Sequence, residues 1–226
     1  MTQFYLVRHG QAAFGSADYD RLTEVGVRQS RWLGEYYAER GLAFDAVFAG
    51  DQQRHRQTWA ALATALPGTP EPQIHAGLNE YDFGALIRAA TGADAPAATD
   101  PAASGRRSVY GLLSRALEAW AAGRLDGVVP ESWDQFGSRV GAALAQLLAA
   151  AGRGRKILVV CSGGPIARLL GLALGLADRT IIGLNLQLQN SAFAHLYHDG
   201  ESFQLASFNS LPHLDRPERR AAMSHI

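Results

Sequence analysis

An arginine and a histidine end the first apolar segment of the chain. Residues 4–7 are strand formers, and Arg8, His9 and Gly10 follow them directly. In open α/β sheets, ligands bind beyond the carboxyl ends of the strands, which is where these side chains would lie. A neutral imidazole can attack phosphorus, and a planar guanidinium can hold phosphoryl oxygens. The pair therefore indicates phosphoryl transfer, and a solvated strand edge is the alternative for the tripeptide taken alone.

Further segments repeat, in the same order, the motifs of one known family. These segments are residues 22–29, 54–58, 78–84, 157–164 and 209–214. Together with the Arg-His-Gly of the first strand, they resemble the histidine phosphatase superfamily, whose fold is phosphoglycerate-mutase-like. The resemblance extends over nearly the whole chain. It implies that the histidine after the first strand carries a phosphoryl group during the reaction.

By this resemblance, His9 is the nucleophile and Arg8 is its phosphate-binding partner. Arg54 falls at the position of the second phosphate-clamping arginine, at the start of a predicted helix where backbone N–H groups favour an anion. Glu80 resembles the proton donor, which protonates the leaving oxygen and then deprotonates the attacking water. The alternative for Arg54 is a solvated arginine on the helix face, an interpretation that suits Arg56 better. The alternative for Glu80 is an exposed loop glutamate without a role. Because the arginines and the proton donor compensate the charge, the resemblance implies neither a metal nor a cofactor.

The main departure from the family pattern follows the fourth predicted strand. The family has Ser-His-Gly-Gly there, and this chain has Cys161, Ser162, Gly163 and Gly164. Ser162, with Gly163 beside it in the phosphate site, still offers one hydroxyl donor. A neutral hydrogen bond contributes about 0.5–1.5 kcal/mol, against about 1.5–3 kcal/mol for a charged one. Gly50 also replaces a serine that usually precedes the clamping arginine by four residues. We therefore expect a slow phosphatase or a protein that binds phosphate without turnover.

Several functions fit these residues to different degrees. The first is a phosphomonoester hydrolase that acts on a small phosphorylated molecule through phospho-His9. A catalytically impaired phospholigand-binding or regulatory relative is the second, and a mutase-type phosphotransferase is less favoured because no further basic cluster is visible for a second phosphate. A serine hydrolase based on Ser162 is disfavoured, since the glycine of a nucleophile elbow is missing and no acidic residue and histidine follow in a recognisable order.

Composition limits the partners and the compartment. The 226 residues include 21 basic and 21 acidic side chains, so no overall field favours nucleic acid or a membrane surface. The single cysteine, Cys161, excludes an internal disulfide. The amino terminus lacks the pattern of a signal peptide, and the longest apolar stretch, residues 169–177, is shorter than the ~20 residues of a membrane span. We expect a cytoplasmic protein whose partner is a small phosphoester; a homodimer remains open.

Alternating strand and helix patterns predict an α/β fold of three layers, with a mostly parallel central sheet and a helical lid insertion. The predicted strands are residues 4–7, 46–49, 71–78 and 156–161, with a closing hairpin of 190–197 and 202–208. The predicted helices are residues 24–40, 52–66, 110–125, 131–151 and 166–176. We expect one domain over 1–226, with the lid at about 85–135. Within it, residues 89–105 are a mobile loop, followed by Arg106 and Arg107 as candidate substrate contacts. Residues 215–226 form a polar tail.

Overall fold

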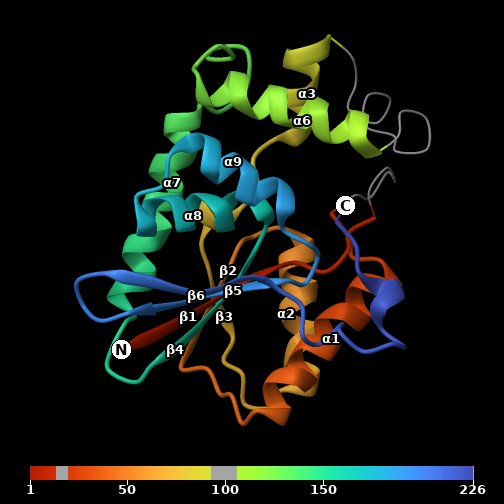
Figure 1. Ribbon diagram of the computed structural model, residues 1–226. Coiled ribbons are helices and arrows are strands. Elements are labelled where there is room, and N and C mark those ends of the chain that lie inside the picture. Colours follow the sequence, from red (N-terminus) through yellow and green to blue (C-terminus); the bar gives the residue numbers. More distant parts are fainter. Residues whose placement is uncertain (14–19, 93–105, 226) are drawn as a thin grey trace.

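A computed structural model describes residues 1–13, 20–92 and 106–225 of the chain, without the side chains of 106–109. Its centre is a six-stranded sheet with the order β3-β2-β4-β1-β5-β6 (Figure 1). The strands are β1 (Thr2–Arg8), β2 (Ala46–Ala49), β3 (Pro72–Ile74), β4 (Lys156–Cys161), β5 (Phe193–His198) and β6 (Phe203–Ser210). The first four run parallel, and β5 and β6 are antiparallel at one edge. The predicted α/β class with a mostly parallel sheet is confirmed.

Helices cover both faces of the sheet and make the three predicted layers (Figure 1). The helices are α1 (Glu24–Glu39), α2 (Gln53–Ala65), α3 (Phe83–Thr91), α6 (Arg106–Ala121), α7 (Trp133–Ala149), α8 (Gly163–Leu174) and α9 (Asp178–Gln187). Tyr5 and Val7 of β1 pack into the core on the α1 and α2 side, whereas Phe4 and Leu6 pack into the core on the α7 and α8 side. Because both faces are buried, this strand reads as a continuous apolar run.

The central strands end at the same level. In β1 and β4 Arg8 pairs with Cys161, and in β2 and β4 Ala49 pairs with Val160. The next residue after β1, His9, donates its backbone N–H to the Cys161 carbonyl at 2.9 Å. Residues that follow these strands therefore meet at one edge of the sheet, as parallel strands require.

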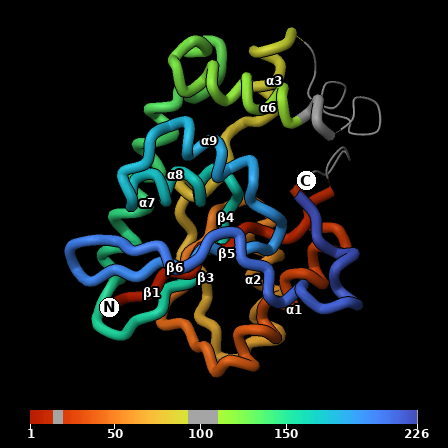
Figure 2. Tube along the Cα trace, in the orientation of Figure 1, coloured from red at the N-terminus to blue at the C-terminus, as the bar shows by residue number. Residues whose placement is uncertain are grey.

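The helices α3 and α6 form a separate layer beyond α9, at the top of Figures 1 and 2. There α6 packs against both α3 and α9. Most of α3 and all of α6 fall within the predicted insertion at about 85–135, and the role of the insertion as a lid stays a prediction. The expected loop 89–105 is wrong at its start, because α3 continues to Thr91. Its remainder lies almost entirely outside the described residues, as do the side chains of Arg106 and Arg107.

Other boundaries differ for local reasons. The predicted helix 110–125 begins at Arg106 and ends at Ala121, before turns in which Gly123 and Gly127 have positive φ angles. Helix α8 begins three residues before the predicted Ile166, because Ser162 takes the N-cap position. The helix α9 was not predicted; only Ile181 and Ile182 of it are buried, which leaves a weak apolar pattern. The side chains of Thr23 and Ser132 cap the starts of α1 and α7.

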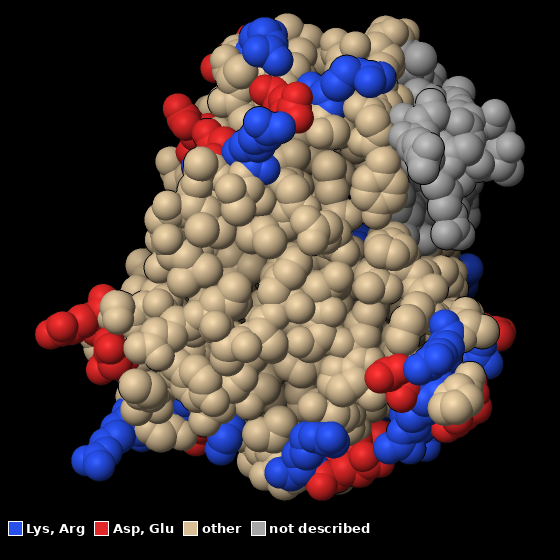
Figure 3. All heavy atoms as spheres, in the orientation of Figure 1, with Lys and Arg blue, Asp and Glu red and all other residues tan. Residues whose placement is uncertain are grey.

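Charged side chains lie mostly around the rim of the face shown in Figure 3, and the middle of this face is largely uncharged. In the part of the chain that the structure describes, none of the helices combines the length and the apolar character that crossing a bilayer takes.

Candidate active site

His9 is the first residue after β1 and is 4% exposed. Its ring Nδ1 lies 2.7 Å from the carbonyl oxygen of Gly10. A carbonyl can only accept, so the shared proton belongs to Nδ1 and the Nε2 lone pair is available. Burial, with the charges of Arg54 and Arg8, lowers the pKa of His9 well below its ordinary value. His9 is therefore neutral at neutral pH, which is the state of a nucleophilic imidazole.

Arg54 is the second residue of α2 and is 3% exposed. One of its nitrogens, Nη1, donates to Asp20 at 2.6 Å, and Nη2 donates to the Gln52 side chain at 2.8 Å. Asp20 also accepts from the backbone N–H of Gln53 at 2.7 Å, at the start of α2. No sequence pattern indicated a role for Asp20, which lies 34 positions before Arg54. Arg56, by contrast, is exposed and pairs with Asp51, as expected for a solvated arginine on the helix face.

Glu80 follows the 3-10 helix η1 (Ala76–Leu78), and its carboxylate reaches the start of α8. Its two oxygens accept from the N–H groups of Gly164 at 3.2 Å and Tyr81 at 3.3 Å. A Cβ on Gly164 would approach the carboxylate closer than 3.0 Å, so this position requires glycine. Burial raises the pKa of Glu80, against the opposing charge of Arg54. A carboxyl group with a raised pKa can hold a proton for a leaving group.

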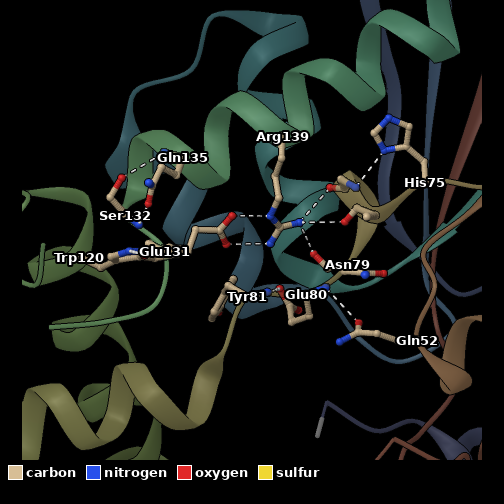
Figure 4. Close-up of polar contacts among 12 residues, drawn as sticks. Gln52, His75, Asn79, Glu80, Tyr81, Trp120, Glu131, Ser132, Gln135 and Arg139 are labelled. Carbon is tan, nitrogen blue, oxygen red and sulfur yellow. Dashed lines mark hydrogen bonds and ion pairs between the residues drawn. The ribbon is translucent and has the colours of Figure 1, made fainter. Parts of the chain in front are cut away.

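Arg139 of α7 holds the loop that ends at Glu80, as Figure 4 shows. It binds both carboxylate oxygens of Glu131, at 2.5 and 2.9 Å, which fixes its guanidinium plane. From that position Nη1 donates to the carbonyls of Gly77 at 3.1 Å and Asn79 at 2.7 Å. Arg139 thus ties the residue before Glu80 to a core helix, a contact that no local sequence pattern indicates.

Ser162 and His55 meet behind these residues. Both are fully buried, and the Ser162 hydroxyl lies 2.8 Å from Nε2 of His55 and 3.5 Å from Nη2 of Arg54. The His55 ring centre is 5.7 Å from that of His9. Sequence reasoning gave His55 no role. The available signal was its place on the face of α2 that also carries Thr58 and Leu62, both of which are buried.

A cavity opens onto part of this group. Arg8, Glu80 and Gly163 line it on one side, and Arg8 also donates to the Leu188 carbonyl. The rest of the lining is mainly aromatic and apolar: Tyr81, Phe83, Tyr110, Leu113, Asn185, Leu186 and His225. His9, Arg54 and Ser162 are buried more deeply. At the carboxyl ends of β1 and β4 the structure therefore brings together six of the predicted site residues: Arg8, His9, Arg54, Glu80, Ser162 and Gly163.

Comparisons of the sequence with known proteins find relatives over most of the chain. The sequence profile of the histidine phosphatase superfamily (branch 1) matches residues 4–211. A 2,3-bisphosphoglycerate-dependent phosphoglycerate mutase from Methylobacterium sp. (strain 4-46) is 29% identical over 193 residues, which cover 80% of this chain and 85% of the relative. The "Probable phosphoglycerate mutase GpmB" of Yersinia pestis (strain Pestoides F) is 26% identical and covers 96% and 97%.

Solved structures share the fold. A phosphoserine phosphatase variant from Entamoeba histolytica superposes with a TM-score of 0.65 at 21% identity, over 95% of this chain and all of that one. A mycobacterial glucosyl-3-phosphoglycerate phosphatase gives 0.65 at 20% identity, over 92% and 98%. At these identities the likeness shows the fold alone. With a family profile that spans most of the sequence, the chain belongs to the histidine phosphatase superfamily.

Proposed function

We propose that this protein hydrolyses a phosphomonoester of a small molecule through a phosphohistidine at His9. The observation that carries the proposal is the state of the His9 ring: neutral, buried, and held with Nδ1 on the Gly10 carbonyl, so that Nε2 is the free nucleophile. Arg8 and Arg54, whose positive charges act on the ring, would compensate the negative charge of a transferred phosphoryl group.

The reaction has two steps. In the first, Nε2 of His9 attacks phosphorus, the bond to the leaving oxygen breaks, and Glu80 gives that oxygen its proton. In the second, the Glu80 carboxylate takes a proton from water, the resulting hydroxide attacks phosphorus, and the P–N bond breaks to release phosphate and neutral His9. The raised pKa of Glu80 and its place on the cavity wall beside Arg8 support this role.

The cavity favours hydrolysis of a compact phosphoester. Among the described residues that line it, Arg8 is the one arginine and there is no lysine, which leaves little to hold a second phosphate. The fold relatives named as phosphatases act, by their names, on small phosphorylated molecules. A mutase-type phosphotransferase is the second candidate, because the curated relatives carry that name.

The test compares release of phosphate from p-nitrophenyl phosphate by the wild type, His9→Ala and Arg56→Ala. We expect hydrolysis by the wild type and by Arg56→Ala, whose side chain is exposed, and none by His9→Ala. Equal hydrolysis by wild type and His9→Ala would overturn the proposal. Binding of inorganic phosphate without hydrolysis would establish the non-catalytic alternative instead. Unchanged rates in a metal chelator are expected, because the proposed steps use no metal.

A further inference from the structure

The cavity beside Arg8 and Glu80 has a part that the proposed reaction does not use. It lies where α3, α6 and α9 come together (Figure 1). Five aromatic or aliphatic side chains from these helices and from the loop before α3 line it: Tyr81, Phe83, Tyr110, Leu113 and Leu186. We call these five side chains the apolar wall. Because the wall and the residues of the reaction line one cavity, a group attached to the phosphate can reach it.

The hydroxyl groups of the apolar wall have partners within the protein. The Tyr110 hydroxyl donates to the Leu186 carbonyl at 2.9 Å, and the Tyr81 hydroxyl accepts from the side-chain amide of Asn185 at 2.9 Å. Burial of a polar group is costly when it loses its hydrogen bond. An apolar ligand group that covers these two rings leaves both bonds intact, so it can bind without that cost.

Core packing holds the apolar wall in place. The ring centre of Tyr81 lies 5.1 Å from that of Trp120 and 5.7 Å from that of Phe136. On the other side of the cavity, Leu113 of α6 is 7% exposed and packs with the fully buried Ile87 of α3. A ligand therefore meets side chains that are already ordered, which lowers the entropic cost of binding.

The charges around the cavity do not suit an anionic group against this wall. Among the described residues of the lining, Arg8 is the one arginine and there is no lysine, and the proposed reaction uses Arg8 for the phosphoryl group. A carboxylate or a second phosphate on the leaving group would lose water beside aromatic and aliphatic side chains. An uncharged apolar group would gain free energy from the same burial.

We propose that the apolar wall binds the leaving group, and that the substrate is the phosphomonoester of an uncharged, apolar alcohol, such as one that carries a phenyl ring. The proposal rests on the proposed function for the position of the phosphoryl group, beside His9 and Arg8. The alcohol leaves with the proton that Glu80 gives to its oxygen. A leaving group that carries a carboxylate is the competing interpretation.

The experiment compares three phosphonates by isothermal titration calorimetry: ethylphosphonate, 2-phenylethylphosphonate and 3-phosphonopropionate. They share the ethyl phosphonate unit and differ at its end, which is a hydrogen, a phenyl ring or a carboxylate. We expect the phenyl compound to bind about 10- to 100-fold more tightly than ethylphosphonate, the scale of burying one apolar side chain. We expect no gain for the carboxylate.

Variants of Tyr110 locate the binding of the ring. Tyr110→Ala should reduce the preference for phenyl over ethyl about 2- to 10-fold, because a ring contact is lost. Tyr110→Phe should keep the preference within about 2-fold, since the ring and not the hydroxyl makes the contact, and it guards against a folding defect in Tyr110→Ala. The matched control is Tyr197→Ala on β5, a partly buried tyrosine outside the cavity lining, which should leave the preference unchanged.

Three results would overturn the proposal: phenyl and ethyl compounds of equal affinity, a carboxylate compound that binds as tightly as the phenyl compound, or no binding of any of the three. Because the P–C bond of a phosphonate is not hydrolysed, these affinities do not depend on turnover. A preference for phenyl in a protein that never releases phosphate would disprove only the proposed function. Hydrolysis through His9 without this preference would disprove only the substrate class.

Discussion

The Gly10 carbonyl holds the ring of His9 in one tautomer, and the carboxyl group of Glu80 has a pKa that is shifted in the opposite direction. Burial lowers the pKa of His9 and raises that of Glu80, so a neutral imidazole and a protonated carboxyl can coexist. Pairs of groups whose pKa values are pushed apart in this way mark the nucleophile and the acid of a site.

Glu80→Gln tests the proposed role of Glu80 as the proton donor to the leaving group. The variant should lower kcat most for alkyl phosphates, whose leaving groups need a proton, and least for p-nitrophenyl phosphate. In the wild type, kcat/KM for alkyl phosphates should fall as the pH rises through the raised pKa of Glu80, because the proton is then lost, and Glu80→Gln should abolish that fall. Equal losses on both substrate types would exclude Glu80 as the acid.

Gly50→Ala tests whether the ring of His55 requires a glycine at position 50. In the wild type the added methyl meets the imidazole ring of His55 and, at 2.9 Å, the side-chain oxygen of Asn79, so the unfolding free energy should drop by about 1–3 kcal/mol, as expected for overpacking. In a His55→Ala background the closer of these two contacts is gone, and the same change should cost less. Urea unfolding of the four proteins measures the difference, with Gly183→Ala on α9, where the nearest side-chain atom is 3.9 Å from the new methyl, as a tolerated control. A similar cost in both backgrounds would mean that the ring does not set the need for glycine.

At the scale of elements, the alternating strands and helices bring the site residues to one edge of the sheet, and helix α7 fixes the loop that carries Glu80. The contacts from Arg139 of α7 to the carbonyls before Glu80 explain why a short loop can aim a carboxylate at the start of α8. A fixed loop matters because small misplacements of a catalytic group are costly.

Arg139→Lys should loosen this loop, since an ammonium cannot bind Glu131 and the carbonyls together. We expect kcat for alkyl phosphates to fall about 10- to 100-fold, by analogy with displaced catalytic groups. The fall should be smaller for p-nitrophenyl phosphate, because Arg139 acts through Glu80. Arg168→Lys on α8, another partly buried arginine in an ion pair, is the control and should change stability without this dependence on the leaving group. A uniform loss on both substrates would assign Arg139 a structural role only.

Elements with strong local patterns were predictable from the sequence. The apolar runs of β1 and β4 stand out because both faces are buried, and the caps at Thr23 and Ser132 are local. The helix α9 was not predictable, since most of its side chains are exposed or only partly buried and give no clear apolar pattern. The partnership of His55 and Ser162 joins residues 107 positions apart, so it is invisible to any local pattern.

At the scale of the whole molecule, the end of the chain returns to the cavity. The segment predicted as a polar tail is tied to the rest of the molecule: the Ala222 carbonyl accepts from Gln29 at 2.6 Å, and the Ser224 carbonyl accepts from the N–H of Asn190 at 2.8 Å. These contacts place His225 in the cavity lining, 3.5 Å from the Tyr110 hydroxyl. Composition indicated polarity correctly and gave no sign of this return.

His225→Ala should therefore affect the substrate more than the chemistry. We expect KM for p-nitrophenyl phosphate to rise about 2- to 10-fold, the scale of one lost hydrogen bond, with kcat nearly unchanged. Steady-state kinetics with His198→Ala as the control, on β5 away from the cavity lining, would check it. An unchanged KM would show that the tail only covers the site.

The central claim is a phosphoryl group on Nε2 of His9. Protein mixed with a phosphomonoester should be quenched in denaturant at alkaline pH, digested, mapped by mass spectrometry and examined by phosphorus NMR, which distinguishes the two ring nitrogens. We predict an acid-labile phosphate on Nε2 of His9, because Nδ1 is engaged with the Gly10 carbonyl, and no label in His9→Ala. A label on Ser162, on Nδ1 or on the His9→Ala protein, or turnover without any phosphoenzyme, would contradict the account.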